Sequence, residues 1–202
     1  MCAGRSACAG AAHHTQNTID TVVSANRIVC GHTGSLRVEN FHFARDMLAV
    51  RPPSRDPARR LFLTRAPARG RILRNEREVA AMLARFGFET VDTDVCSLDE
   101  QIALFAGARA VVAVHGAGIV NAQFRWPRPF TLVELFPPWY VHPPFAWMAQ
   151  QLGWGYGAIC GSRADASDSF VVDVDDLRDC VDAALAQPGS DTGRTDEELE
   201  VS

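Results

Sequence analysis

From residue 60 onward, short apolar runs alternate with stretches in which hydrophobic residues recur at helical spacing. The apolar runs predict strands, which fall at residues 61–64, 88–91, 110–114, 130–135, 156–160 and 170–172. The helical spacing between them predicts helices that begin near Asn75, Ser97, Ile119, Pro143 and Asp173. Strands that alternate with helices in this way predict an α/β fold: a Rossmann-like parallel sheet with helices on both faces.

Capping signals mark where two of these helices begin. Asn75 with Glu78, and Ser97 with Glu100, have the spacing of capping boxes, in which side chains satisfy the free backbone N–H groups at a helix start. Gly107 follows the last periodic residue of the second helix and predicts its end.

The composition of the chain predicts four segments. Residues 1–18 are small and polar without periodicity, and residues 187–202 are polar and acidic, so we expect both ends to be disordered. Residues 19–58 contain one helical stretch, over about residues 40–50, and then a proline-rich break. This segment is interpreted as a connector or a remnant of an N-terminal domain, and residues 59–186 as the Rossmann-like domain.

The charged residues restrict the chemistry further. All 20 basic residues are arginine, so lysine chemistry is excluded and any phosphate must be held by guanidinium and backbone N–H groups. A net charge of −4 argues against a nucleic-acid-binding protein. The chain has no C-x-x-C or H-x-x-x-H pattern of a metal site and no apolar run long enough for a transmembrane segment. We therefore expect a cytoplasmic protein without a bound metal.

Arginines gather after the first predicted strand. Arg65, Arg69, Arg71 and Arg74 precede the expected helix start at Asn75. Ligands of parallel α/β sheets bind at the carboxyl ends of the strands, and arginine can give a diphosphate two parallel hydrogen bonds. The segment therefore predicts a diphosphate site, in which Arg65 is the first candidate. For Arg69 and Arg74, a solvated basic turn is an equally good interpretation.

A glycine-rich turn follows the buried strand at residues 110–114. His115, Gly116, Gly118 and Asn121 lie in this turn, where the glycines allow a ligand to approach the backbone closely. Glu134 lies inside an apolar strand, where an ionised carboxylate needs a partner. A ribose or an arginine is the expected partner.

Two other motifs offer alternative interpretations. Gly116, Gly118 and the downstream Glu134 resemble part of a dinucleotide fingerprint, which leaves an NAD-dependent oxidoreductase as an alternative, although the third glycine is missing. Residues 92–94 form the D-x-D pattern of metal-dependent sugar-nucleotide enzymes. Three residues in an Asp-rich chain are a weak signal, and the arginines can replace the metal.

Taken together, the motifs resemble glycosyltransferase family 61 over about residues 60–182. The matching positions are Arg65, Arg71, Asn75-Glu76, Phe86-Gly-Phe88, Ser97 to Ile102, His115-Gly-Ala-Gly118, Asn121 and Val133-Glu-Leu135 with Pro137. The resemblance implies an inverting, metal-independent transferase of the two-domain GT-B type, active in polysaccharide biosynthesis. Its donor is a nucleoside-diphosphate sugar bound by the carboxyl-terminal half, and its acceptor is a glycan. The implied donor-pocket residues are Arg65, Arg71, Asn75, His115, Gly116, Gly118, Asn121 and Glu134.

The resemblance also sets an expectation about the rest of the enzyme. A GT-B transferase needs an amino-terminal acceptor domain, and only about 60 residues precede the donor-type half. We therefore expect a truncated donor-binding half that works with a missing N-terminal domain or a partner chain, and peripheral membrane attachment is an alternative to a free cytoplasmic protein. The catalytic base is not assigned. A non-catalytic nucleotide-binding module is the alternative function.

Overall fold

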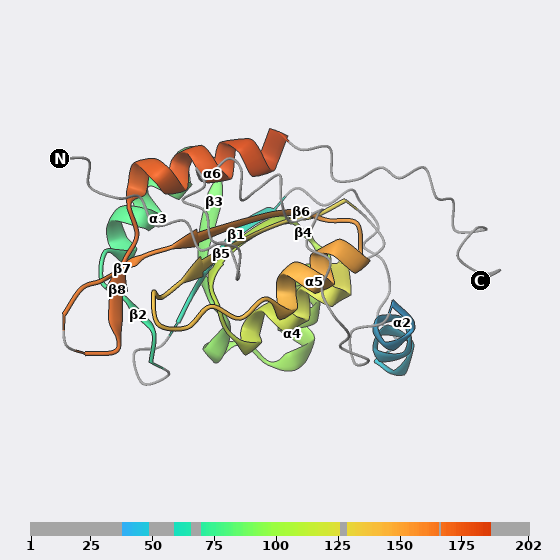
Figure 1. The fold of residues 1–202 in the computed structure, drawn as a ribbon. Helices are drawn as coiled ribbons and strands as arrows, with labels where there is room; N and C mark the ends of the chain where they lie inside the picture. Colours follow the sequence, from blue (N-terminus) through green and yellow to red (C-terminus); the bar gives the residue numbers. More distant parts are fainter. Residues whose placement is uncertain (1–37, 49–58, 66–69, 126–128, 166, 187–202) are drawn as a thin grey trace.

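A five-stranded parallel sheet forms the centre of the molecule, and helices cover both faces (Figure 1). The computed structural model describes residues 38–48, 59–65, 70–125, 129–165 and 167–186. The order of the strands is β3-β1-β4-β5-β6, and all neighbours are parallel. Their bounds are β1 (Arg59–Thr64), β3 (Phe88–Asp92), β4 (Ala108–Val114), β5 (Thr131–Phe136) and β6 (Gly155–Cys160). The predicted α/β class, Rossmann-like and parallel, is confirmed.

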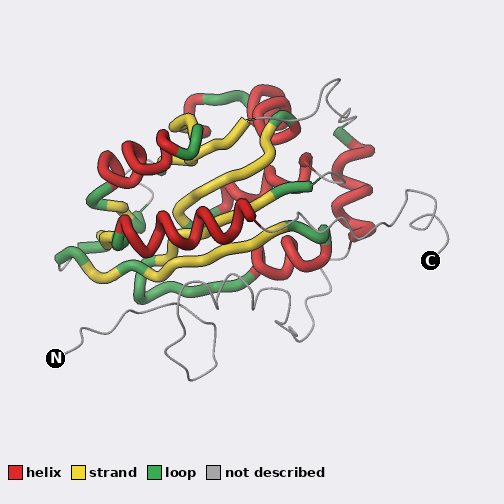
Figure 2. Tube along the Cα trace, turned by 90° about the horizontal axis from the view of Figure 1, so that it is seen from above, coloured by secondary structure: helices red, strands yellow, loops and turns green. Residues whose placement is uncertain are grey.

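The helices divide between the two faces of the sheet, as Figures 1 and 2 show. One face is covered by α3 (Glu76–Arg85) and α6 (Val174–Ala186), and the other by α4 (Leu98–Ala106), the 3₁₀ helix η4 (Ala117–Arg125) and α5 (Pro144–Gln151). Each layer of helices buries its own apolar cluster against the sheet, because both faces of the central strands are hydrophobic. None of the described helices is long and apolar enough to cross a membrane.

The strand order creates a switch point between β1 and β4. The chain leaves β1 for β3 on one side and later returns to β4 on the other side, so the connections diverge from this pair of strands. Divergent connections leave a crevice at the carboxyl ends of the two strands, which is where open α/β sheets bind ligands. A short 3₁₀ helix, η3 (Thr93–Val95), and the start of η4 border this crevice.

A second, smaller sheet lies beside the main one. It contains β2 (Ile72–Leu73), β8 (Ser169–Val171) and β7 (Ser162–Arg163), with β2 parallel and β7 antiparallel to β8. The predicted strand at residues 170–172 therefore belongs to this sheet. Neither β2 nor β7 was predicted, because two residues carry no periodic signal.

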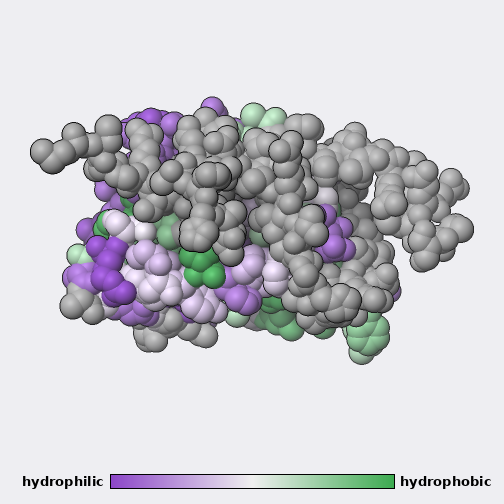
Figure 3. All heavy atoms as spheres, viewed as in Figure 1, coloured by the Kyte–Doolittle hydropathy of each residue, from purple (hydrophilic) through white to green (hydrophobic). Residues whose placement is uncertain are grey.

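The helix expected over residues 40–50 is α2 (Val38–Met47). Its Phe41 packs into the core, whereas Phe43 and Met47 are exposed. Hydrophobic surface is accordingly visible in Figure 3 where α2 lies in Figure 1. The predicted disordered ends and most of the connector segment lie outside the described residues.

The two predicted capping boxes have different outcomes. Ser97 accepts a hydrogen bond from the Glu100 backbone and Glu100 bonds back to the Ser97 N–H, so this box is confirmed. The box at Asn75 is wrong, because its side chain makes no cap bond to α3. Instead Asn75 Nδ2 donates to the carbonyl of Val172 (2.8 Å), and its Oδ1 accepts from the Val172 N–H (3.2 Å). The Asn75 side chain therefore makes a tertiary contact with Val172 and does not cap the helix as the local pattern had predicted.

Candidate functional site

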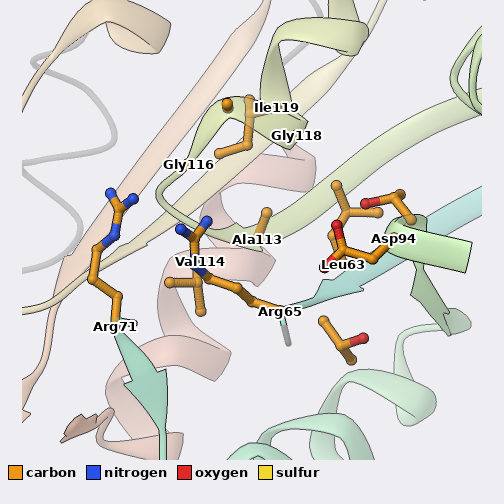
Figure 4. A pocket seen from close by; sticks show the side chains of 12 residues that line it. Leu63, Arg65, Arg71, Asp94, Ala113, Val114, Gly116, Gly118 and Ile119 are labelled. Carbon is orange, nitrogen blue, oxygen red and sulfur yellow. The ribbon is translucent and has the colours of Figure 1, made fainter. Parts of the chain in front are cut away.

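A cavity of about 140 Å³ opens at the switch point. It is lined by the carboxyl ends of β1 and β4, by Arg71, by Thr93 and Asp94 of η3, and by the turn at residues 116–118. Figure 4 shows the guanidinium groups of Arg65 and Arg71 side by side below this turn, with Asp94 on the other side of Arg65. The pocket therefore presents two cations at one end and a carboxylate at the other.

Arg65 is fixed in the pocket by two backbone features. Its Nε–H donates to the carbonyl of Gly70 at 3.0 Å. Its guanidinium lies against Gly116, so a methyl group on Gly116 would overlap Nη1 and lie 3.3 Å from Cζ. The backbone of Gly116 is outside the left-handed region, and glycine is needed there to make room for the arginine. The first glycine of the turn thus serves Arg65 directly.

Arg71 stands beside Arg65 and packs on an aromatic ring. Its Cζ lies 5.0 Å from the centre of the Tyr140 ring, a distance at which a guanidinium is attracted to the ring face. This contact limits the orientations of the guanidinium and keeps it at the pocket wall. Two oriented guanidinium groups make the pocket suited to a phosphate-containing anion.

Arg74, a further arginine of the predicted diphosphate site, is not among the residues that line the pocket. Arg74 forms an ion pair with Asp165, 2.9 Å between Nη2 and Oδ2, with both side chains about half exposed. Arg69 lies outside the described residues. The four-arginine cluster therefore contributes Arg65 and Arg71 to the described pocket.

Gly118 lines the pocket without a close neighbour on its Cβ side. A methyl group there would have its nearest contact at 3.7 Å, with Thr93 Oγ1. Glycine at this position is therefore not required by the protein's own packing, and the residue is exposed where it lines the pocket.

Behind the pocket, His115 and Glu134 form a buried polar pair. His115 Nδ1 lies 2.7 Å from Glu134 Oε1, and Tyr156 donates to Glu134 Oε2 at 2.7 Å. Within the protein, the partners of Glu134 are thus a histidine and a tyrosine and not the expected arginine, and both carboxylate oxygens are bonded. Burial raises the pKa of Glu134 above its usual range, against the opposing effect of the His115 bond. Burial and the neighbouring Glu134 raise the pKa of Tyr156 well above its usual value, so Tyr156 stays a hydrogen-bond donor.

Aromatic rings enclose the imidazole of His115. The ring is stacked on Phe136, with centroids 4.9 Å apart, and Tyr140 and Phe145 each lie 5.5 Å away. His115 is buried, and its residue neighbours Val114 and Gly116 line the pocket. The imidazole is therefore held in one orientation next to the pocket by a bond at Nδ1 and by ring packing.

The two asparagines of the predicted site brace other elements. Asn121 Nδ2 donates to Gln101 Oε1 at 2.7 Å, while Gln101 Nε2 donates to the carbonyls of Thr93 and Cys96. This chain of bonds joins η4, α4 and the η3 segment that carries part of the pocket wall. Asn75 connects α3 to Val172, as described above.

Among the described residues, no group of three His, Cys, Asp or Glu side chains is placed to hold a metal ion. Within the D-x-D pattern, Asp92 Oδ1 accepts the backbone N–H of Asp94 at 2.9 Å, as the N-cap of η3.

Tyr156 was not identified from the sequence, whereas Thr93 and Asp94 were noted there only as part of the D-x-D pattern. Thr93 and Asp94 line the pocket because they follow β3, and their place after a predicted strand was the available signal. Tyr156 of β6 lies opposite Leu132 of β5. Leu132 is two residues before Glu134, so its side chain and that of Glu134 are on the same face of the sheet. Only the register of β5 and β6 reveals this neighbour.

The fold and the pocket define a Rossmann-like α/β protein with a pocket at its switch point that is lined by two arginines. The family model described as Glycosyltransferase 61 matches residues 12–133, more than half of the chain, so the chain belongs to this family and is a transferase enzyme. The matched range contains Arg65, Arg71 and the glycine turn and ends one residue before Glu134. No curated protein matches the sequence.

Proposed function

We propose that the chain binds a nucleoside-diphosphate sugar in the switch-point pocket and transfers the sugar, with inversion, to a hydroxyl group of a glycan. The observation that carries the proposal is the placement of Arg65 and Arg71 at the carboxyl ends of the central strands, in a pocket bordered by the glycine turn. The sugar nucleotide, the acceptor and the inverting course are parts of the proposal.

In such a transfer, the acceptor oxygen forms a bond to the anomeric carbon while the bond from that carbon to the diphosphate breaks. Negative charge develops on the departing diphosphate, and the proton of the acceptor hydroxyl passes to a base. Oriented cations stabilise this charge without having to reorganise. Arg65, held by Gly70, and Arg71, packed on Tyr140, are suited to this role, and Asp94 at the other end is suited to accept hydrogen bonds from sugar hydroxyls.

Calorimetric titration with uridine and guanosine diphosphates tests the proposal. We expect binding by the wild-type chain and, since a hydrogen bond to a charged group contributes about 1.5–3 kcal/mol, a loss of affinity of about 10- to 150-fold in Arg65→Ala and in Arg71→Ala. Arg74→Ala is the matched control. It removes an arginine of the same segment, but this arginine pairs with Asp165 and does not line the pocket. Equal affinities in all three variants would contradict the assignment of the pocket.

A second measurement separates catalysis from binding alone. Release of nucleoside diphosphate from a sugar nucleotide only when an acceptor is present supports the transferase reaction. If the chain binds the sugar nucleotide but no turnover occurs, even after a partner domain is added, the result would instead support the alternative of a non-catalytic nucleotide-binding module.

A further inference from the structure

The turn that carries Arg71 is held by a residue nearly one hundred positions later in the chain. Gly70 and Arg71 have φ angles of 66° and 56°, a left-handed conformation that residues with a Cβ rarely adopt. Arg71 is the only non-glycine residue of the described chain with a positive φ. Its backbone N–H donates to Asp168 Oδ2 at 2.7 Å, and the N–H of Ile72 donates to the Asp168 carbonyl at 2.9 Å.

The carboxylate of Asp168 also fills the space beside Gly70. A methyl group on Gly70 would overlap Oδ2 of Asp168, so the turn and this side chain fit only with glycine at position 70. Directly after the turn, β2 pairs with β8, with Ile72 opposite Ser169. Asp168 therefore closes the end of the small sheet and fixes the conformation of the turn.

Both guanidinium groups of the pocket depend on this turn. The carbonyl of Gly70 accepts the Nε–H of Arg65 at 3.0 Å, and Arg71 is itself the second residue of the turn. Asp168 is not among the residues that line the pocket, so it reaches a ligand only through the two arginines.

We propose that Asp168 is a positioning residue for the anion site, which holds the Gly70–Arg71 turn in the conformation that orients Arg65 and Arg71 toward the ligand. The inference rests on the proposed function, since it concerns the affinity of the same pocket for a diphosphate. It assigns a role to a residue outside the range of the family match.

The test is the affinity for uridine diphosphate, measured by calorimetry in Asp168 variants. Asp168→Ala removes the carboxylate that accepts the hydrogen bond of the Arg71 N–H. We expect the affinity for uridine diphosphate to fall about tenfold or more. Asp168→Asn keeps an acceptor oxygen for the Arg71 N–H, and we expect affinity within about threefold of the wild type. Asp182→Ala is the control for charge, because it removes an exposed carboxylate of α6 and leaves the turn unchanged.

A second variant covers the case in which Asp168→Ala does not fold. Gly70→Ala disturbs the same contact from the other side, and we expect a similar loss of affinity. In the double variant of Gly70→Ala and Asp168→Ala, the new methyl group no longer meets the Asp168 carboxylate. The loss of affinity in the double variant should therefore be smaller than the sum of the two single losses.

The outcomes separate the two proposals. If the wild type binds and folded Asp168→Ala binds equally well, the role of Asp168 is refuted and the proposed function stands. Equal losses in Asp168→Ala and Asp182→Ala would also refute it, because net charge would then explain the effect. Absence of diphosphate binding by the folded wild type overturns both.

Discussion

Substitution of Gly116 by alanine tests how the pocket orients Arg65. The new methyl group would overlap Nη1, the mobile end of a side chain, so the arginine can move away while the backbone stays in place. Moving the arginine breaks its hydrogen bond to the Gly70 carbonyl, which lowers the free energy of unfolding by about 0.5–1.5 kcal/mol. Replacing glycine by alanine also restricts the unfolded chain, which raises the free energy of unfolding by about 0.4–1 kcal/mol. We therefore expect the free energy of unfolding to change by less than about 1 kcal/mol.

The affinity for a diphosphate should change much more than the stability. A displaced Arg65 no longer donates to the ligand, and the loss of about 1.5–3 kcal/mol corresponds to about 10- to 150-fold weaker binding. Calorimetry with uridine diphosphate measures this, and urea unfolding checks that the variant is folded.

Gly107→Ala is the matched control. Its methyl group would meet only ordinary contacts at 3.5 Å or more, at the amino end of β4, away from the pocket. If Gly116→Ala binds the diphosphate as well as Gly107→Ala does, the reasoning about Arg65 is wrong.

Three further predictions concern the surroundings of the pocket. Because the pKa of Glu134 is raised in the folded state, its contribution to stability is present below the unfolded pKa and is lost as the pH rises through the folded pKa. The unfolding free energy of the wild type relative to Glu134→Gln should therefore fall with rising pH in urea titrations, and a constant difference would contradict the burial argument. Alanine substitutions of Asn121 and Gln101 should show a coupling energy of about 0.5–1.5 kcal/mol in a double-mutant cycle of unfolding, whereas additive losses would argue against their bond. Ser97→Ala should cost about 0.5–2 kcal/mol of stability through the lost cap of α4, and an unchanged denaturation midpoint would show that the cap contributes nothing.

The sequence predicts those parts of the molecule that depend on local patterns. The main strands are apolar runs and the Ser97 cap lies three residues from its partner, so both were found. The contacts that orient the site connect distant segments: Asn75 with Val172, and Glu134 with Tyr156. Such contacts follow from strand order and register, which the periodicity of one chain does not specify.

The absence of lysine gains a structural meaning at the pocket. Arg65 uses its Nε–H for the Gly70 carbonyl while its Nη1 lies at Gly116, and Arg71 places a flat cation over the Tyr140 ring. A lysine carries one ammonium group on a flexible stem, so it cannot donate to the turn and to a ligand with separate nitrogens, and it has no planar face for the ring. The site thus depends on the geometry of the guanidinium group as much as on its charge, and the backbone around it, with glycines at 70 and 116, is shaped to hold that geometry.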